Sequence, residues 1–125
     1  MKIVSTTSAP AAIGPYSQAV VTDGFVFASG QIPLCPESGQ IVEGGIQEQA
    51  EQVCKNIGAL LQAANSDYSR VIKTTCFLQT MDDFAAFNEV YARYFTSLPA
   101  RSCVAVAGLP RNVSVEVEVI AKVNA

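Results

Sequence analysis

Two apolar runs near the C-terminus constrain the fold more than any other feature of this sequence. The first covers residues 99–110, the second covers residues 113–119, and Gly, Pro and Asn residues stand between them. Residues of these types favour a turn between two strands. The sequence therefore predicts that Arg101 in the first run and a glutamate of the second, Glu116 or Glu118, can lie on neighbouring strands, in apolar surroundings.

The alternation within the last strand predicts two unlike faces of a sheet. One face carries Val113, Val115, Val117, Val119 and Ala121, and the other carries Ser114, Glu116, Glu118 and Ile120. The first face suits a core, because side chains two residues apart point to the same side of a strand. The second face is too apolar for water and too polar for a core. We expect it to be a subunit interface that contains a polar pocket.

Local patterns predict the remaining elements. Strands are expected over 1–7, 16–21, 25–31 and 71–80, with an Asp23-Gly24 hairpin turn, one amphipathic helix over 46–65, and a second helix after Asp82 and Asp83 with an aromatic stripe of Phe84, Phe87, Tyr91 and Tyr94. Two helices can cover only one face of such a sheet. The prediction is an α/β (α+β) fold, a single domain over 1–125 with one six-stranded mixed sheet and two helices on one face.

Composition points to self-association and against nucleic acid. Half of the 125 residues are hydrophobic and 15% are charged, which is apolar for a small monomer and indicates contact between subunits. The net charge of −3 and the scattered basic residues argue against a nucleic-acid partner.

The residue types exclude several chemistries. Histidine is absent, which removes any Ser-His-Asp or Cys-His mechanism. The four cysteines are far apart without a CxxC pair, so we expect neither a metal site nor a cofactor. Without an apolar leader or a membrane-length run, free thiols and a cytoplasmic location are expected, with no membrane partner.

Arg101 is the residue best suited to bind a ligand. A guanidinium is planar, permanently charged and forked, which suits two-point binding of a carboxylate. The alternative is an internal ion pair with Glu116 or Glu118, and pattern alone favours this alternative because structural ion pairs are commoner than sites. Pattern alone does not choose between the two glutamates.

Other candidates each have a plainer interpretation. Ser29 and Gly30 end a strand where the backbone could approach a ligand, although a glycine there could equally mark a bulge. Tyr16 could be a core aromatic, Asn88 an exposed helix residue, and Cys103 a small buried thiol. Without histidine to lower its pKa, Cys103 is a poor nucleophile.

Five segments, taken in order, resemble the RidA family, also called YjgF, of reactive-intermediate (enamine/imine) deaminases. They are Gly14-Pro15-Tyr16-Ser17-Gln18-Ala19, Ser29-Gly30-Gln31-Ile32-Pro33, Asn88-Glu89-Val90-Tyr91, Pro99-Ala100-Arg101-Ser102 and Val115-Glu116-Val117. The spacing of the last two segments is specific to the family. The resemblance covers essentially the whole chain, with Val117 where Ile or Met is usual.

The resemblance implies a chorismate-mutase-like fold in a homotrimer, whose three sheets close a central barrel with sites in the clefts between subunits. It assigns the substrate carboxylate to Arg101 and a positioned water to Glu116. It further implies that Gly30 contributes a backbone N–H, that the Cys103 backbone contacts the substrate nitrogen, and that Tyr16, Ser29 and Asn88 line the pocket.

The implied activity is hydrolysis of enamine and imine intermediates, of the 2-aminoacrylate and 2-iminopropanoate type, to 2-oxo acids and ammonia. Such a reaction needs only proton delivery and a held water, because the C=N carbon is already electrophilic. The rival hypothesis is a module that binds 2-oxo acids without turnover, and relatives are also described as translation inhibitors or endoribonucleases. The acidic net charge weakens the nuclease alternative.

Overall fold

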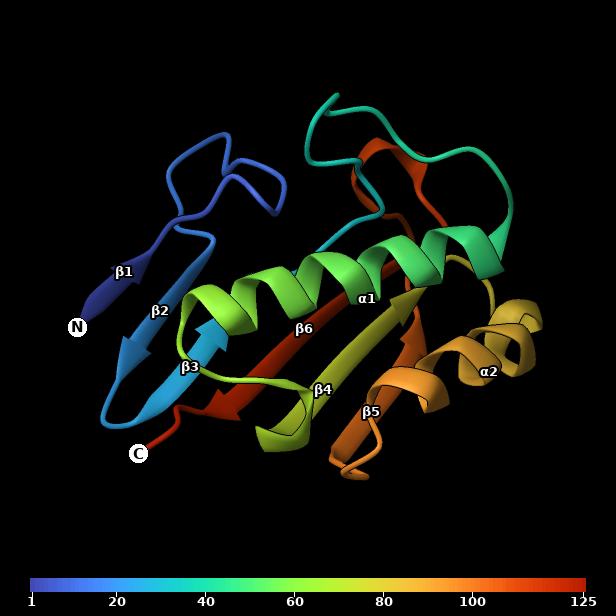
Figure 1. Cartoon of the computed structure of the whole chain (residues 1–125). Coiled ribbons are helices and arrows are strands. Elements are labelled where there is room, and N and C mark those ends of the chain that lie inside the picture. The colour runs from blue at the N-terminus through green and yellow to red at the C-terminus, as the bar shows by residue number, and fades with distance from the viewer.

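The fold is one six-stranded mixed sheet with two α-helices on one face. The computed structural model describes all 125 residues, and both helices lie on the same side of the sheet (Figure 1). The elements are β1 (Lys2–Val4), β2 (Ala19–Thr22), β3 (Phe25–Ala28), α1 (Ile46–Ala63), β4 (Val71–Leu78), α2 (Phe84–Tyr94), β5 (Ala100–Ala105) and β6 (Val115–Lys122). The predicted fold class and element order are confirmed.

The predicted hairpin forms around Asp23 and Gly24. Strands β2 and β3 pair antiparallel with Thr22 opposite Phe25. Asp23 has φ 53° and Gly24 has φ 80°. Two successive left-handed residues make the tight turn whose twist matches a right-handed hairpin, and Asp-Gly is a favoured sequence for it.

Asp82 and Asp83 place negative charge at the start of α2 and form no side-chain capping bond there. A short 3₁₀ turn, Met81–Asp83, precedes the helix, and its capping bond runs from the Asp82 N–H to the Thr80 hydroxyl. Asp83 stands directly before Phe84 without a side-chain capping bond. The acidic pair is therefore a favourable charge at a helix N-terminus, and Thr80 caps the 3₁₀ turn that precedes the helix.

The order of strands corrects one prediction. The sheet runs β1-β2-β3-β6-β4-β5, so β4 separates β5 from β6. Strand β4 pairs in parallel with β5 and antiparallel with β6. The turn residues after β5 specify a change of direction but not a partner. Strand β6, whose alternate residues are all buried, lies inside the sheet, whereas the more exposed β5 forms an edge. Arg101 and Glu116 are not on neighbouring strands.

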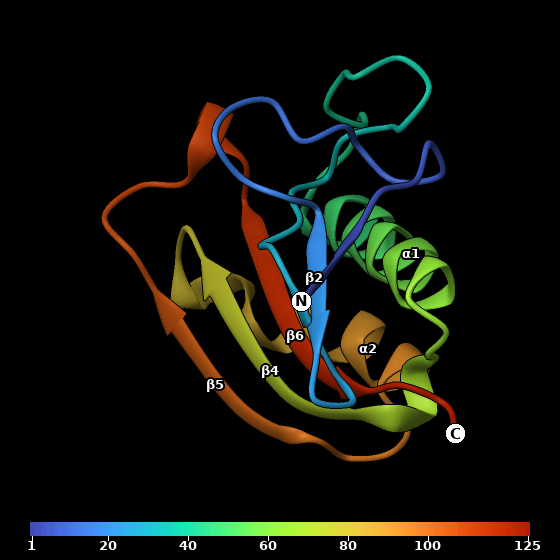
Figure 2. The same ribbon diagram turned by 90° about the vertical axis from the view of Figure 1, so that its left-hand side faces the viewer.

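The predicted contrast between the two faces of the sheet is confirmed. Side chains on the helix side of β6 are at most 2% exposed, from Val115 to Ala121, and they pack with the helices in one hydrophobic core. No helix covers the other face, which is open in the side view (Figure 2). Phe27 and Val104 are 42% and 46% exposed. Apolar groups thus lie uncovered on the helix-free face.

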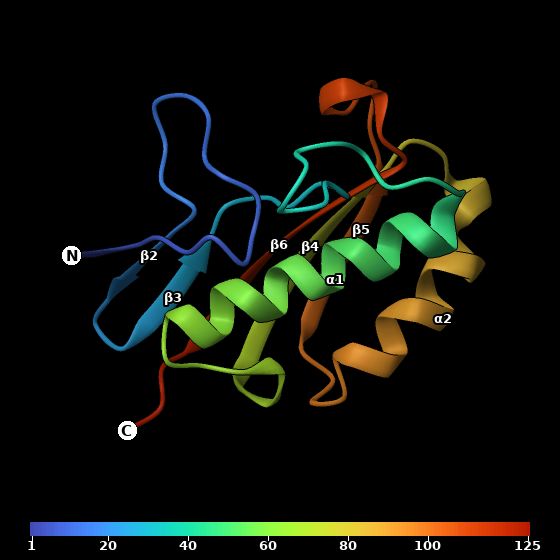
Figure 3. The same ribbon diagram turned by 45° about the horizontal axis from the view of Figure 1, so that its top comes forward.

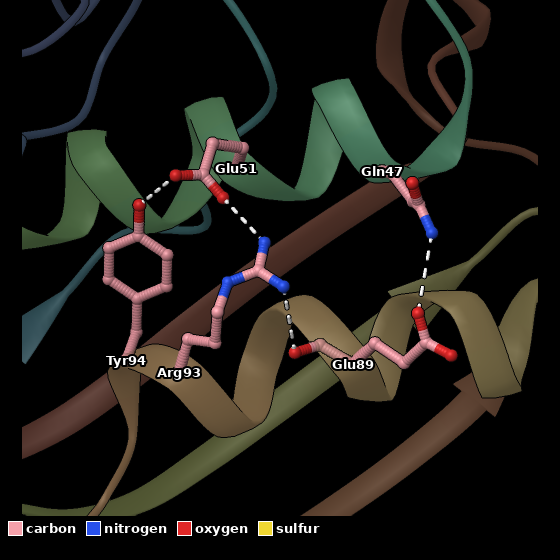
Figure 4. A network of polar contacts seen from close by, with 5 residues as sticks. All are labelled: Gln47, Glu51, Glu89, Arg93 and Tyr94. Carbon is pink, nitrogen blue, oxygen red and sulfur yellow. Dashed lines mark hydrogen bonds and ion pairs between the residues drawn. The ribbon is translucent and has the colours of Figure 1, made fainter.

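A polar network ties the outer surfaces of α1 and α2 together. Glu51 accepts a hydrogen bond from the Tyr94 hydroxyl and forms an ion pair of 3.2 Å with Arg93 (Figure 4). The Gln47 amide donates to Glu89 at 3.4 Å. These contacts fix the two helices relative to each other above the sheet. Neither helix is long and apolar enough to cross a membrane.

Candidate active site

Arg101 lies in a cradle built by one face of α2. Its Nη1 donates to Asn88 Oδ1 at 2.7 Å. The guanidinium carbon lies 4.7 Å from the centroid of the Tyr91 ring and 5.5 Å from that of Phe84. Phe84, Asn88 and Tyr91 are spaced four and three residues apart, so they share one side of the helix. Aromatic faces and a neutral amide orient the cation without neutralising it.

No carboxylate of the chain pairs with Arg101. The only ion pair in the structure joins Arg93 and Glu51 on the helices. The internal pair that pattern alone favours, with Glu116 or Glu118, is therefore wrong. Arg101 turns toward α2, whereas both glutamates alternate with buried valines of β6 and point to the helix-free face. Strand β4 and the thickness of the sheet stand between the charges.

Cys103 lies beside Arg101 on the same side of β5. It is partly buried and stands opposite Cys76 in the parallel pairing of β4 and β5. Burial raises the pKa of the Cys103 thiol, and the Arg101 charge and a hydrogen bond with Cys76 only partly offset this. Burial also raises the pKa of Cys76, to about 12. Both thiols therefore stay protonated near neutral pH, as predicted for a residue that is not a nucleophile.

Glu116 and Gly30 meet on the other side of the molecule. A Cβ placed on Gly30 would lie 2.8 Å from the carboxyl carbon of Glu116, so the Glu116 side chain would have to move to make room for it. The residue after Gly30, Gln31, exchanges two backbone hydrogen bonds with Val117. Gly30 donates its own N–H to no other group of the chain. Glycine at this position thus lets the Glu116 carboxylate approach the backbone closely, and the Gly30 N–H is free for a ligand.

Ser29 and Tyr16 complete the surroundings of Gly30. The Ser29 hydroxyl donates to the carbonyl of Ser17 at 2.6 Å, and its N–H donates to the carbonyl of Gln18 at 2.9 Å. Ser29 therefore holds the segment of Tyr16 against the end of β3. Tyr16 is 54% exposed, and one small cavity is lined by both Tyr16 and Gly30.

Two predictions about Tyr16 are thereby corrected. Strand β2 begins at Ala19, so Tyr16 lies in the preceding loop, and its ring is not a core aromatic. The prolines and glycine of that loop keep the chain out of the sheet until Ala19, because proline removes a donor from the ladder.

The pKa of the Glu116 carboxyl is raised, so it binds a proton more readily than an ordinary glutamate. Burial raises its pKa above the ordinary value of 4.5, and the nearby charge of Glu118 raises it further. Both causes disfavour the ionised form. A carboxyl tuned in this direction is better suited to exchange a proton with a bound water than an ordinary surface glutamate.

The predicted site residues therefore form two separate groups within one chain. We call Asn88, Arg101 and Cys103 the arginine half-site, and Tyr16, Ser29, Gly30 and Glu116 the glutamate half-site. The two half-sites lie on opposite faces of the sheet. Phe84 and Tyr91, whose rings hold Arg101, belong to the first group and were predicted only as an aromatic stripe. Their spacing with Asn88 on one helix face was the signal that could have linked them to Arg101.

The two half-sites offer hydrogen-bonding and charged groups to a ligand. No group of three or more His, Cys, Asp or Glu side chains gathers where it could hold a metal ion. A free guanidinium fork, a free backbone N–H and a carboxyl of raised pKa are the groups that the structure offers to a ligand.

Fold and half-sites together define a class of small α+β proteins with one mixed sheet, two helices on one face, and oppositely charged groups on its two sides. The chain belongs to the Rid family: the family model described as "Endoribonuclease L-PSP" matches residues 6–123, and a solved relative is named as a member of the conserved Rid protein family. The resemblance seen in the sequence is confirmed.

Individual relatives match over nearly their whole length. A Lactococcus lactis protein whose name describes it as a regulator, AldR, is 56% identical over 99% of both chains. A Mus musculus protein named 2-iminobutanoate/2-iminopropanoate deaminase is 54% identical over 96% of this chain and 90% of its own. The crystal structure of E. coli TdcF with bound serine has a TM-score of 0.94 and 44% identity, covering 99% of this chain and all of that one.

Proposed function

We propose that this protein is a deaminase that hydrolyses short 2-imino acids, and the enamines that give rise to them, to 2-oxo acids and ammonia. Several relatives of about 50% identity carry the name 2-iminobutanoate/2-iminopropanoate deaminase. A small amino acid, serine, is bound in the structure of TdcF, which shares the fold.

The observation that carries the proposal is the uncompensated charge of Arg101. Its partners are an amide and two aromatic rings, and no carboxylate of the chain faces it. A guanidinium held in this way keeps its remaining N–H groups for an external anion. The carboxylate of a 2-imino acid is such an anion, and two parallel hydrogen bonds would fix its orientation.

Glu116 would carry the proton transfers. A water held by its carboxylate adds through oxygen to the imine carbon, giving its proton to the carboxylate, and the C=N bond becomes a single bond. That proton passes to the nitrogen and gives a carbinolamine. The carboxylate then takes the proton of the new hydroxyl and delivers it to the nitrogen, so the C–N bond breaks and ammonia leaves as the C=O bond forms. The Gly30 N–H and the backbone of Cys103 would orient the substrate, whereas the Cys103 thiol takes no part.

One chain cannot apply both half-sites to one substrate, because they lie on opposite faces of the sheet. We therefore place the site between subunits of a homotrimer, with the arginine half-site of one chain facing the glutamate half-site of another. The uncovered apolar side chains of the helix-free face and the unpaired edge of β5 support association. Tyr16, Ser29 and Asn88 would shape the pocket, directly or by holding their neighbours.

The test is hydrolysis of an imine made in place. A pyridoxal-phosphate-dependent dehydratase acting on serine would supply 2-aminoacrylate, and release of the 2-oxo acid would be followed with and without this protein. We expect faster release with the protein. An unchanged rate with several imino acids would reject the deaminase.

A second candidate, a metabolite-binding regulator, is supported by the name of the Lactococcus relative. The same pocket would then bind 2-oxo acids without turnover. Calorimetry would show 2-oxo acid binding in both cases, so the distinguishing result is binding without acceleration of imine hydrolysis. The net charge of −3 gives no support to an RNA substrate. Four free thiols are consistent with a cytoplasmic location, which is part of this proposal.

A further inference from the structure

Two buried amide side chains of α1, Gln49 and Asn56, bond to backbone outside their own helix. Gln49 is 9% exposed and Asn56 is 1% exposed. They are seven residues apart, about two helical turns, so they lie on the same face of α1. Amide side chains are usually exposed, and burying two of them on a core face requires specific hydrogen-bond partners.

Gln49 fixes the start of the strand that carries Glu116. Its Oε1 accepts a hydrogen bond of 2.8 Å from the N–H of Ser114. Ser114 immediately precedes β6 and stands two residues before Glu116. The carbonyl of Ser114 is also used, because it accepts a bond of 3.0 Å from the N–H of Gln79. Both the N–H and the carbonyl of Ser114 are thus hydrogen-bonded, and this fixes the backbone two residues before Glu116.

Asn56 fixes the segment that follows Gly30. Its Nδ2 donates to the carbonyls of Ile32 and Leu34 at 3.2 and 3.0 Å. Its Oδ1 accepts from Gln52 at 2.9 Å, so both donors and the acceptor of the amide are engaged. The orientation of the Asn56 side chain is therefore fully determined. The loop after β3 passes alongside α1 in consequence (Figure 3).

We propose that Gln49 and Asn56 are positioning residues for the glutamate half-site, and that α1 sets the separation of Gly30 and Glu116 through them. This inference rests on the proposed deaminase function. Helix α1 is an 18-residue element whose N-terminus is fastened by the Gly45 N–H bond to Glu48 at 2.8 Å. Two side chains of one rigid helix fix two separate segments with the precision that a held water requires.

The test compares two substitutions of Gln49. Gln49→Met keeps the length and burial of the side chain but removes the acceptor for Ser114. Gln49→Glu restores an acceptor, and its charge is tolerated because the residue lies near the positive end of the helix dipole. We expect Gln49→Met to lower kcat about tenfold with KM changed less than about twofold, since Arg101 is untouched. Gln49→Glu should recover most of kcat.

The pH profile supplies a readout that a merely structural role would not move. In Gln49→Met, a less tightly held Glu116 carboxyl would be more exposed to water, and this would lower its pKa. The acid limb of the pH profile of kcat should therefore shift to lower pH. A ¹³C NMR titration should show the same downward shift in the pKa of the Glu116 carboxyl. Wild-type kcat and pH profile in folded Gln49→Met protein would overturn the proposal. So would a Gln49→Glu variant as impaired as Gln49→Met.

Asn56→Asp tests the second contact independently, and it decides the matter if Gln49→Met fails to fold. The carboxylate has the shape of the amide but cannot donate to the two carbonyls, so kcat should fall with KM nearly unchanged. An unchanged kcat would overturn the role of Asn56.

Gln47→Met is the matched control. Gln47 is an exposed glutamine of the same helix whose amide contacts Glu89 on α2 and neither half-site. Its substitution should leave kcat, KM and the pH profile unchanged. If wild-type protein itself fails to hydrolyse imines, the proposed function is rejected. If the wild type is active and the Gln49 and Asn56 variants match it, only the positioning inference is rejected.

Discussion

The arginine half-site and the glutamate half-site are built in opposite ways. Arg101 is held by three side chains of a single helix, Phe84, Asn88 and Tyr91, at helical spacing. Glu116 lies beside Glu118 of its own strand and against Gly30, which comes from a segment far away in the chain. The first needs only a correct helix against an edge strand, whereas the second needs several loops and strands to pack correctly.

The comparison also shows why the two charges remain available. If Arg101 and Glu116 shared one face of neighbouring strands, they would neutralise each other, and a ligand would have to break a buried ion pair. The sheet keeps them on opposite faces, so each charge stays unpaired within the chain. In the proposed trimer, this separation would leave each group free to meet the complementary half-site of another chain.

The largest effect is expected from Arg101. Arg101→Ala should lower kcat/KM about a hundredfold or more, because the charge-assisted bonds to the substrate carboxylate are lost. Arg101→Lys should fail nearly as badly, since one ammonium cannot replace the fork. Stability should fall by only about 1 kcal/mol, from lost contact with the aromatic rings, because no carboxylate is left unpaired. Steady-state kinetics and thermal unfolding measure both effects.

A different outcome would contradict the separation of the half-sites. If Arg101→Ala instead lowered stability by about 3 to 5 kcal/mol, a buried partner charge would have to exist. Wild-type hydrolysis by folded Arg101→Ala protein would remove Arg101 from the mechanism.

Mixing two inactive variants tests whether the half-sites combine between chains. Arg101→Ala and Glu116→Gln chains should each be nearly inactive alone. In a trimer that contains both variants, about one site in three would receive intact Arg101 and intact Glu116 from different chains. Co-expression with two purification tags and an assay of the mixed fraction would measure this recovery. No recovery in mixed trimers would show that a site does not take its halves from different chains.

Gly30→Ala is expected to damage the glutamate half-site alone. The added Cβ would collide with the Glu116 carboxyl and displace it, so kcat should fall about tenfold or more. Affinity for a 2-oxo acid, which depends on Arg101, should change much less. Gly108→Ala is a matched control, because nothing lies within 4 Å of a Cβ at that position. Equal kinetics for the two variants would disprove the steric role of Gly30.

A moderate effect is expected from Glu118→Gln. Glu116 must be ionised to accept a proton, so activity falls as pH drops through its pKa, which burial and Glu118 place above 4.5. Removing the Glu118 charge lowers that pKa, so the acid limb of the pH–rate profile should move to lower pH. Glu43→Gln provides a control of equal charge change. If the acid limb moved to higher pH, or moved equally in Glu43→Gln, the Glu118 charge would not be what raises the pKa of Glu116.

The smallest effect is expected on the outer surface of the helices. Arg93→Met removes the ion pair with Glu51. The side chains of Arg93 and Glu51 are 62% and 34% exposed, respectively. Exposed ion pairs contribute less than about 1 kcal/mol to stability. The free energy of unfolding measured with urea should therefore fall by no more than this amount, and kcat and KM should stay unchanged. A loss of activity would mean that the spacing of α1 and α2 reaches a half-site, and that the two regions are coupled.

Local features of the sequence were sufficient for the elements and for the family. Asp23-Gly24 fixed a hairpin because few residue pairs accept two left-handed conformations. Alternation in β6 identified its core face because side chains repeat every two residues along a strand. The motif around Arg101 identified the family, since its residue types and spacing are specific.

Only the tertiary structure decided how those elements place the chemistry. The period of a strand shows which of its own residues share a face, but it does not show which strand lies beside it. The insertion of β4 between β5 and β6 is a choice made by long-range packing, and it separates Arg101 from Glu116. The close contact at Gly30 likewise comes from a carboxyl more than eighty residues away in the chain. Such contacts leave no local pattern, because they depend on how distant segments are brought together around the core.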